Sequence, residues 1–257
     1  MQVVRSADES RQAHQGSGPV CSFRGDSHLA MTINFAPRLL AWFDQHGRHD
    51  LPWQHPREPY RVWVSEIMLQ QTQVRTVVGY FGRFIARFPD LRALAAASLD
   101  DVLAAWSGLG YYARARNLQR AAQRCVSVHG GCLPESFEAL AQLPGIGRST
   151  AGAILAQAHG QRHAILDGNV RRVLARHKRI AGDPASPAVL SRLWAAAEDL
   201  LPQNRLADYT QALMDLGAGI CTRANPACLI CPLAGDCEAR IHGEQTLLPT
   251  PRARRDR

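Results

Sequence analysis

Apolar residues recur along most of this chain with the spacing of about 3.6 residues that is typical of an α-helix. Phe35, Leu39, Leu40 and Phe43 would share one helix face, and Gly47 ends that helix. No segment alternates apolar and polar positions for long, which argues against β-strands. The sequence therefore predicts an all-α protein of about ten helices. The further helices are expected at residues 60–74, 76–88, 98–106, 111–129, 137–143, 148–159, 169–180, 188–201 and 206–217.

The two ends of the chain differ from this helical middle. Residues 1–30 are rich in Ser, Gly, Gln, His and Arg and show no sustained period, which predicts a disordered tail. Residues 243–257 are expected to form a basic tail. The longest stretch without a charged residue is 149–161, well short of the ~20 apolar residues that a membrane span needs. We therefore expect no membrane segment, and the first ten residues do not form a secretory signal.

The chain has 30 basic and 22 acidic residues, and its formal net charge is +8. All of the basic residues except Lys178 are arginines. A basic excess of this size favours a polyanionic partner such as a nucleic acid. An arginine-rich composition can also reflect the base content of a genome, so the charge alone leaves both explanations open.

A glycine-rich turn joins two of the expected helices. In the stretch Leu-Pro-Gly-Ile-Gly-Arg-Ser-Thr-Ala, Gly145 and Gly147 leave the backbone bare, and Ser149 and Thr150 open the second helix. Backbone N–H groups at a helix N-terminus can then approach a phosphate oxygen. This pattern predicts a helix-hairpin-helix motif, which grips one DNA strand without reading its sequence. The alternative is an ordinary turn between helices that ends on a glycine cap.

Four of the seven cysteines crowd into the C-terminal fifth of the chain, at Cys221, Cys228, Cys231 and Cys237. Four thiols so close in sequence predict a metal site. Structural zinc sites usually pair two Cys-x-x-Cys segments and this chain has one, so the spacing favours a 4Fe-4S cluster while zinc stays open. An odd number of cysteines without an export signal also indicates a reduced intracellular protein.

Two carboxyl groups lie in contrasting sequence contexts. Glu66 sits among apolar neighbours, which would raise its pKa and suit a general acid. Asp167 lies at or just before a helix start, where backbone N–H groups and the helix dipole would keep it ionised. Breaking a bond to an anomeric carbon needs such an acid together with a fixed anion. The alternatives are a solvated Glu66 and an Asp167 that only caps its helix.

Aromatic residues and arginines lie together in Gly-Leu-Gly-Tyr-Tyr-Ala-Arg-Ala-Arg-Asn, residues 108–117. Tyr111 could stack into a duplex, and Arg114 could hold a phosphate group. Equally, the tyrosines of this stretch could pack in the protein core. The pattern alone does not decide between these two interpretations.

Together these stretches resemble the helix-hairpin-helix DNA glycosylases and, within them, the adenine DNA glycosylases of the MutY type. The resemblance covers about residues 35–249 and consists of six matches in the same order. They are LPW at 51–53, SEIMLQQTQV at 65–74, GLGYYARARNL at 108–118, LPGIGRSTAGAIL at 143–155, ILDGNVRRVLAR at 165–176, and the four clustered cysteines.

The resemblance implies two helical domains with the active-site cleft between them. Residues 51–160 would form a six-helix domain that carries the helix-hairpin-helix motif. Residues 31–50 and 161–242 would form the domain that holds the 4Fe-4S cluster. Most family members continue into a C-terminal domain that checks for oxoguanine opposite the adenine. This sequence ends at Arg257, so we expect that mispair-recognition domain to be absent.

The resemblance also implies roles for single residues. Glu66 would protonate the adenine ring and later activate water, while Asp167 would stabilise the cationic sugar. Gln71 would fill the space left by the flipped nucleotide, and Tyr111 would intercalate beside the oxidised guanine. Further DNA contacts are expected from Arg114, Gly145, Gly147, Ser149, Thr150 and Asn169.

The implied function is base excision repair, by hydrolysis of the N-glycosidic bond of adenine mispaired with oxoguanine or guanine. A strand-nicking enzyme similar to endonuclease III needs a lysine at the position of Ser149, so the resemblance favours a monofunctional glycosylase. A non-catalytic, cluster-bearing DNA-binding or redox-sensing module would not need both Glu66 and Asp167. We expect a monomer that binds double-stranded DNA in the bacterial cytoplasm, associated with the nucleoid.

Overall fold

The computed structural model describes residues 26–251, with side chains described from residue 34 onward. This range contains helices and no β-strand, so the all-α prediction is confirmed. None of the helices described there is long and apolar enough to cross a membrane. In chain order the helices are α1 (Asp26–His46), α2 (Pro59–Leu69), α3 (Val74–Arg87), α4 (Leu91–Ala96), α5 (Leu99–Trp106), α6 (Ala113–Val128), α7 (Phe137–Ala141), α8 (Arg148–His159), α9 (Gly168–His177), α10 (Pro187–Asp199), α11 (Leu206–Asp215), the π-helix η1 (Leu216–Ile220), the 3₁₀ turns η2 (Cys228–Ile230) and η3 (Ala234–Asp236), and α12 (Glu238–Ile241).

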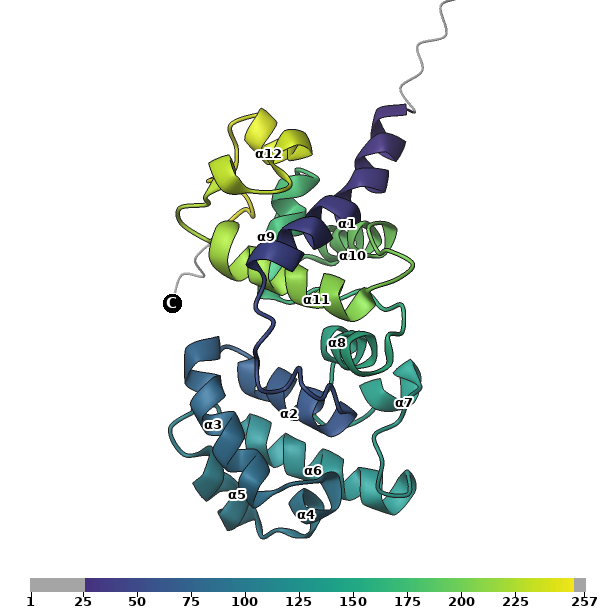
Figure 1. The fold of residues 1–257 in the computed structure, drawn as a ribbon, viewed down its shortest axis with the longest axis vertical. Helices are drawn as coiled ribbons and strands as arrows, with labels where there is room; N and C mark the ends of the chain where they lie inside the picture. The colour runs from purple at the N-terminus through teal and green to yellow at the C-terminus, as the bar shows by residue number, and fades with distance from the viewer. Residues whose placement is uncertain (1–25, 252–257) are drawn as a thin grey trace, which may run out of the picture.

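The helices enclose two hydrophobic cores. The first lies among α2 to α8, and its largest buried side chains are Trp53, Trp63 and Trp106. The second lies among α1 and α8 to α11 and includes Phe35 and Phe43. In Figure 1 the first group of helices fills the lower half of the molecule and the second group the upper half, with α8 at the junction. Each core stabilises one of two helical domains.

Helix α8 contributes to both cores. Ile154 packs in the first core, while Ala153 and Ala156 pack in the second. Small residues allow the chain that follows α8 to lie close against it. A Cβ atom at Gly152 would lie 2.6 Å from the carbonyl oxygen of Ala164, so only glycine permits this approach. The segment held there leads directly into α9.

At two of the helix boundaries that differ from the predicted ones, a non-glycine residue adopts a left-handed conformation. Helix α2 ends at Leu69 and not at residue 74, and Gln71 follows it with φ of 59°. Helix α6 begins at Ala113 and not at residue 111, because Tyr111 has φ of 50°. Side chains make this conformation costly, and the apolar pattern carries no sign of it.

The apolar pattern also does not predict short elements. Helix α4 was not predicted, since six residues are too few to show a period. The Asp90 side chain caps it by accepting a hydrogen bond of 2.8 Å from the Ala93 backbone N–H. Helix α5 is capped in the same way by Ser98, whose Oγ accepts a hydrogen bond of 3.1 Å from the Asp101 backbone N–H.

The predicted terminal tails are described only in part. Helix α1 begins at Asp26, so residues 26–30 are helical and do not belong to the predicted disordered tail. The remainder of that tail, residues 1–25, lies outside the described residues, as do residues 252–257 of the basic tail. Residues 243–251 of the basic tail follow α12.

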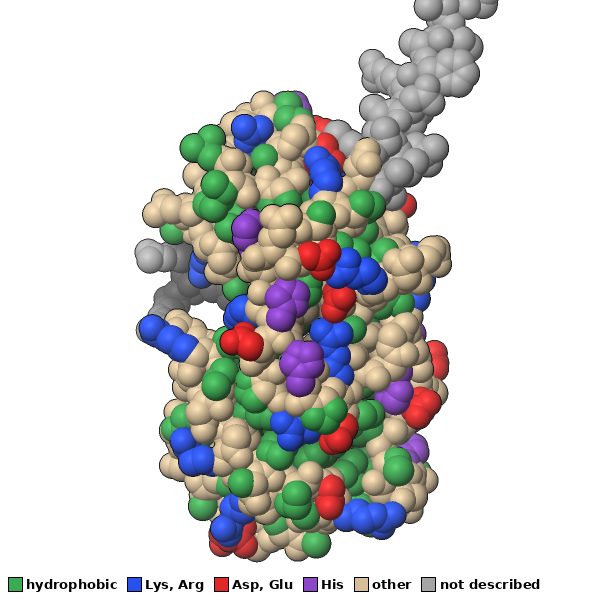
Figure 2. Space-filling model, viewed as in Figure 1, with side chains coloured by type: hydrophobic (Ala, Val, Ile, Leu, Met, Phe, Trp, Pro, Cys, Tyr) green, Lys and Arg blue, Asp and Glu red, His purple; other side chains and the backbone are tan. Residues whose placement is uncertain are grey.

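Arginine–carboxylate pairs fasten the linker between α1 and α2 to α11. Arg48 pairs with Asp215, and Arg57 pairs with Asp208 at 3.1 Å. On the face seen in Figure 2, basic and acidic side chains are interspersed in this way. The net charge of +8 is therefore not gathered as a single basic patch on this face.

Candidate active site

Glu66 lies near the middle of α2, beside the fully buried side chains of Val62 and Trp63. Its own side chain is only partly exposed. Burial raises the pKa of Glu66 to about 7, because the charged carboxylate loses hydration there. A hydrogen bond from Gln157 lowers this pKa, and the negative charge of Asp167 raises it. The raised pKa predicted for Glu66 is confirmed.

Asp167 is the N-cap residue of α9, and its Oδ1 accepts a hydrogen bond of 2.7 Å from the Val170 backbone N–H. Burial nevertheless raises the pKa of Asp167 above its ordinary value, which its sequence context did not indicate, and the ionised state of Asp167 stays a prediction. The backbone N–H groups of Val170 and Asn169 and the charges of Arg172 and Arg171 oppose the rise. The cap is thus present as predicted, but the cost of desolvation exceeds its effect.

The surrounding groups stabilise the charged forms of these two carboxyl groups to different degrees. The Glu66 carboxyl receives one hydrogen bond, from an uncharged amide. Asp167 receives backbone donors at a helix start and faces two guanidinium groups. These surroundings stabilise the charge of Asp167 more than that of Glu66. The two carboxyl groups thus lie in the contrasting settings that a proton donor and a fixed anion require.

Helix α8 positions both carboxyl residues. Near its N-terminus, Ser149 Oγ accepts a hydrogen bond of 2.9 Å from the backbone N–H of Leu166, the residue before Asp167. Near its C-terminus, Gln157 Nε2 donates a hydrogen bond of 2.7 Å to Glu66 Oε1. The residues that approach each other from α2 and α9 are therefore both attached to one rigid helix.

The glycine turn before α8 has the geometry of the predicted hairpin. Gly145 has φ of 81°, and a Cβ atom there would lie 2.9 Å from Asn117 Cβ. Gly147 is the N-cap residue of α8, whose first turn receives no side-chain cap. Both glycines are exposed. The backbone N–H groups at the start of α8 are thus open to an anion. Thr150, the other predicted DNA contact in this turn of α8, has its Oγ1 at 3.5 Å from Gln70 Nε2.

Gln71 and Tyr111 project from two loops, after α2 and before α6 respectively. Both side chains are exposed, Tyr111 to 59%. Both backbones are left-handed, as described above. Strained residues of this kind persist only where their surroundings hold them, and they concentrate at functional sites. Their exposure fits the predicted insertion into DNA, which stays a prediction.

Arg114 does not have the exposed position expected of a DNA contact. Its side chain is buried, and its guanidinium donates hydrogen bonds to backbone carbonyl oxygens of Ile67 and Met68 at 3.0 and 2.9 Å. It also donates to the carbonyl oxygens of Leu109 and Gly110, each at 3.2 Å. A guanidinium suits this task because it offers five donors in a rigid plane. Arg114 therefore braces, from inside, the two loops that carry Gln71 and Tyr111.

The four clustered cysteines line one small cavity of about 30 Å³. Arg176 lies beside them, with Nη1 at 3.3 Å from Cys221 Sγ. Burial raises the pKa of Cys231 to about 11 and also raises that of Cys237. Such thiols need a bound cation to become thiolates. Four thiols around one cavity beside a guanidinium fit a thiolate-ligated metal group, although the described residues hold no set of three ligands around a single ion position.

Arg172 joins the cysteine loop to the start of α9. Its Nε donates a hydrogen bond of 2.7 Å to the Cys221 carbonyl oxygen. Its Nη2 donates to Asn169 Oδ1 at 2.8 Å and to the Gly217 carbonyl oxygen at 2.6 Å. The Asn169 side chain, predicted to contact DNA, thus already has one protein partner. The position of Asp167, two residues earlier, is linked to that of the cysteines through this guanidinium.

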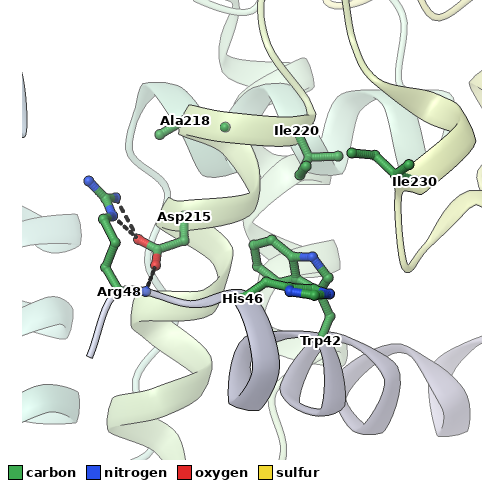
Figure 3. Close-up of a pocket in the computed structure, with 8 residues that line it drawn as sticks. Trp42, His46, Arg48, Asp215, Ala218, Ile220 and Ile230 are labelled. Atoms are coloured by element: carbon green, nitrogen blue, oxygen red, sulfur yellow. Dashed lines mark hydrogen bonds and ion pairs between the residues drawn. The ribbon is translucent and has the colours of Figure 1, made fainter. Parts of the chain in front are cut away.

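A larger cavity of about 580 Å³ lies between the end of α1 and the π-helix η1. Figure 3 shows Trp42 and His46 on one side of it and Ile220 and Ile230 approaching from another. At its edge the Arg48 backbone N–H donates a hydrogen bond of 2.8 Å to Asp215 Oδ2, and the Arg48 guanidinium binds the other oxygen. Neither candidate catalytic carboxyl lines this cavity.

Sequence reasoning missed Gln157, Arg48 and Asp215. Gln157 carries a weak signal, because it is a polar residue beside the apolar positions of α8. The pair of Arg48 and Asp215 spans 167 residues and has no local pattern. Only the folded chain brings these two together.

Replacing Glu66 with glutamine should stabilise the protein at high pH. The unfolded carboxyl releases its proton near its ordinary pKa of 4.5 and the folded one near 7, so the carboxylate destabilises the folded state increasingly between these values. The free energy of unfolding of Glu66→Gln should therefore exceed that of the wild type by up to about 3 kcal/mol above pH 7 and should equal it below pH 4.5. Urea unfolding at several pH values measures this difference. Glu58→Gln, on the exposed N-cap residue of the same helix, is the control, and equal behaviour of the two variants would contradict the assignment.

Removing the Arg114 guanidinium should destabilise the fold strongly. Arg114→Met keeps a long side chain but leaves several buried carbonyl groups without donors, at a cost of about 3 kcal/mol or more in the free energy of unfolding. Arg116, exposed on the same helix, provides the control Arg116→Met, for which a change within about 0.5 kcal/mol is expected. Urea unfolding that gives equal values for both variants would refute the bracing role.

Comparison with known proteins agrees with this geometry. A family model described as the HhH-GPD superfamily base excision DNA repair protein matches residues 64–198. The adenine DNA glycosylase of Buchnera aphidicola (subsp. Acyrthosiphon pisum) is 45% identical over 207 residues, covering 80% of this chain and 59% of that protein. The human adenine DNA glycosylase is 45% identical over 238 residues, covering 89% of this chain and 43% of that protein. The chain thus spans about half the length of these relatives.

Solved structures with the same fold include a thermostable thymine-DNA glycosylase, with a TM-score of 0.76 and 26% identity. That match covers 84% of this chain and all of the other. A non-covalent endonuclease III–DNA complex matches with a TM-score of 0.70 and 20% identity over 83% of this chain and 97% of that one, which shows the fold alone. By sequence and by fold, this chain belongs to the HhH-GPD superfamily of base excision DNA repair proteins.

Proposed function

We propose that this chain is an adenine DNA glycosylase, which hydrolyses the N-glycosidic bond of adenine mispaired with oxoguanine or guanine. The observation that carries the proposal is that one helix, α8, holds both carboxyl residues beside the hairpin, Glu66 through Gln157 and Asp167 through the contact of Ser149 with Leu166. The names of relatives at 45% identity support adenine as the base. Double-stranded DNA is the proposed partner, bound by a monomer in the bacterial cytoplasm with the nucleoid.

Access to the bond requires the adenine to leave the duplex, because a stacked base hides its glycosidic bond. Gln71 would fill the space that the adenine leaves, and Tyr111 would insert beside the opposing purine. Their exposed positions on two braced loops support this assignment. The open backbone N–H groups at the start of α8 would hold a phosphate of one strand.

The chemical step needs a proton for the leaving base and an anion for the sugar. The Glu66 carboxyl donates its proton to a ring nitrogen of adenine, and the glycosidic bond breaks with its electron pair going to the base. Asp167 stabilises the positive charge that develops on the sugar. The Glu66 carboxylate then accepts a proton from the water that adds to the sugar, which restores the starting state.

Strand cleavage would need an amine that attacks the sugar aldehyde. The hydroxyl of Ser149 cannot form an imine, and it is bound to the Leu166 backbone. Lys178 follows the last residue of α9, at the opposite end of that helix from Asp167. These positions support a monofunctional glycosylase.

Cys221, Cys228, Cys231 and Cys237 would hold the 4Fe-4S cluster. The cluster would supply a cross-link between the segments that carry these thiols. Through Arg172, that cross-linked loop would fix the start of α9 and with it Asp167.

A duplex with a single adenine–oxoguanine pair tests the function. We expect nicks only after treatment with hot alkali, which breaks the strand at the abasic site. Glu66→Gln should lower single-turnover excision by two to four orders of magnitude, roughly the contribution of a general acid, while duplex binding persists. Asp167→Asn should also lose excision, since a neutral amide cannot stabilise a cation. Nicks without alkali would indicate a lyase, and no cleavage at all would overturn the proposal.

Metal analysis separates the two candidates for the cysteine site. Protein purified without oxygen should be brown and contain about four iron atoms per chain, with broad visible absorbance from thiolate-to-iron charge transfer. Cys228→Ser should lose iron and soluble yield, whereas Cys132→Ser, on an exposed cysteine outside the cluster, should retain both. Stoichiometric zinc without iron would refute the cluster.

A further inference from the structure

Gln157 is the only buried polar residue of α8. Its side chain is 5% exposed. The other buried residues of the helix are small or apolar, namely Ala151, Gly152, Ala153, Ile154, Leu155 and Ala156. Burying a primary amide among such neighbours costs free energy unless the amide finds a partner. The partner here is the Glu66 carboxyl, with Gln157 Nε2 at 2.7 Å from Glu66 Oε1.

The direction of this hydrogen bond distinguishes the two oxygens of Glu66. Gln157 Nε2 is a donor, so Oε1 must offer a lone pair and cannot carry the proton on that side. Among the described residues, Gln157 alone hydrogen-bonds the Glu66 carboxyl. The acidic proton of neutral Glu66 therefore resides on Oε2, which has no protein acceptor. Part of the Glu66 side chain remains exposed, so a substrate atom can reach it.

We propose that Gln157 is a positioning residue that orients the Glu66 carboxyl, with Oε1 held and the proton of Oε2 presented to the substrate base. This inference rests on the proposed function for the identity of that base. It assigns to α8 a direct part in the proton transfer, beyond its packing in the two cores. Orientation matters because a donor must lie within hydrogen-bond reach and in line with its acceptor.

The same hydrogen bond adjusts the acidity of Glu66. It stabilises the carboxylate and so opposes the rise in pKa that burial causes. The charged group that acts on Glu66 from another helix is Asp167, and its negative charge raises the pKa. Arg114 reaches the last turn of α2 from α6, but it binds backbone carbonyl oxygens there. Removing the amide should therefore leave a weaker acid with a less defined orientation.

The test compares Gln157→Leu with Gln119→Leu. Gln119 is also a buried glutamine, 4% exposed, but its amide donates to the carbonyl oxygen of Ala97, the C-cap residue of α4. In Gln157→Leu, the pH at which single-turnover excision falls should move up by about one unit, and the rate below that pH should drop about tenfold. Gln119→Leu should keep the wild-type profile. Gln157→Met provides a second apolar variant if the leucine variant does not fold.

A second measurement does not depend on excision. The Glu66 carboxyl can be titrated by ¹³C NMR in the whole protein, with its signal assigned by its loss in Glu66→Gln. A raised pKa in Gln157→Leu and an unchanged one in Gln119→Leu support the inference even if adenine is not the substrate. An unchanged Glu66 pKa and an unchanged excision profile in a folded Gln157 variant overturn it. If the wild type excises no adenine but the pKa of Glu66 changes in the Gln157 variants, the proposed function is wrong and the role of Gln157 toward Glu66 is still supported.

Discussion

The contact between α2 and α8 places a carboxyl group where the chain would more stably hold an apolar side chain. Glu66 lies beside the buried Val62 and Trp63, and burial raises its pKa to about 7. A natural protein keeps such a destabilising group when its chemistry requires one. The surrounding structure is arranged around this cost, with one amide against the carboxyl and a second carboxylate nearby on α9.

Helix α8 makes this arrangement possible because it belongs to both domains. Ile154 and Leu155 enter the first core, and Ala153 and Ala156 enter the second, so the two cores share one rigid element. Gly152 allows the segment after α8 to return closely against it, and Ser149 binds that segment just before Asp167. The relative position of Glu66 and Asp167 is therefore set by the contacts of their two segments with one helix, and not by the docking of two independent domains.

The parts of the structure that follow local rules could be predicted from the sequence. Apolar periodicity indicated most helices, and the glycine turn, the Asp167 cap and the apolar setting of Glu66 each depend on near neighbours in the chain. Features that depend on residues far apart in the sequence could not be predicted. Arg114 has the sequence context of a phosphate contact, yet its partners lie at the end of α2, more than 40 residues away. The burial that raises the pKa of Asp167 could not be predicted for the same reason, because burial is a property of the whole fold.

Gln71 and Tyr111 lie 40 residues apart in sequence, yet one guanidinium holds both of their loops. Hydrogen bonds from a charged donor contribute about 1.5–3 kcal/mol each, so neither loop can move freely without breaking several of them. The conformational entropy of both loops is thus lost when the chain folds, before any partner binds. Under the function proposed above, the free energy of DNA binding would then be used to open the double helix and would not be needed to order the protein.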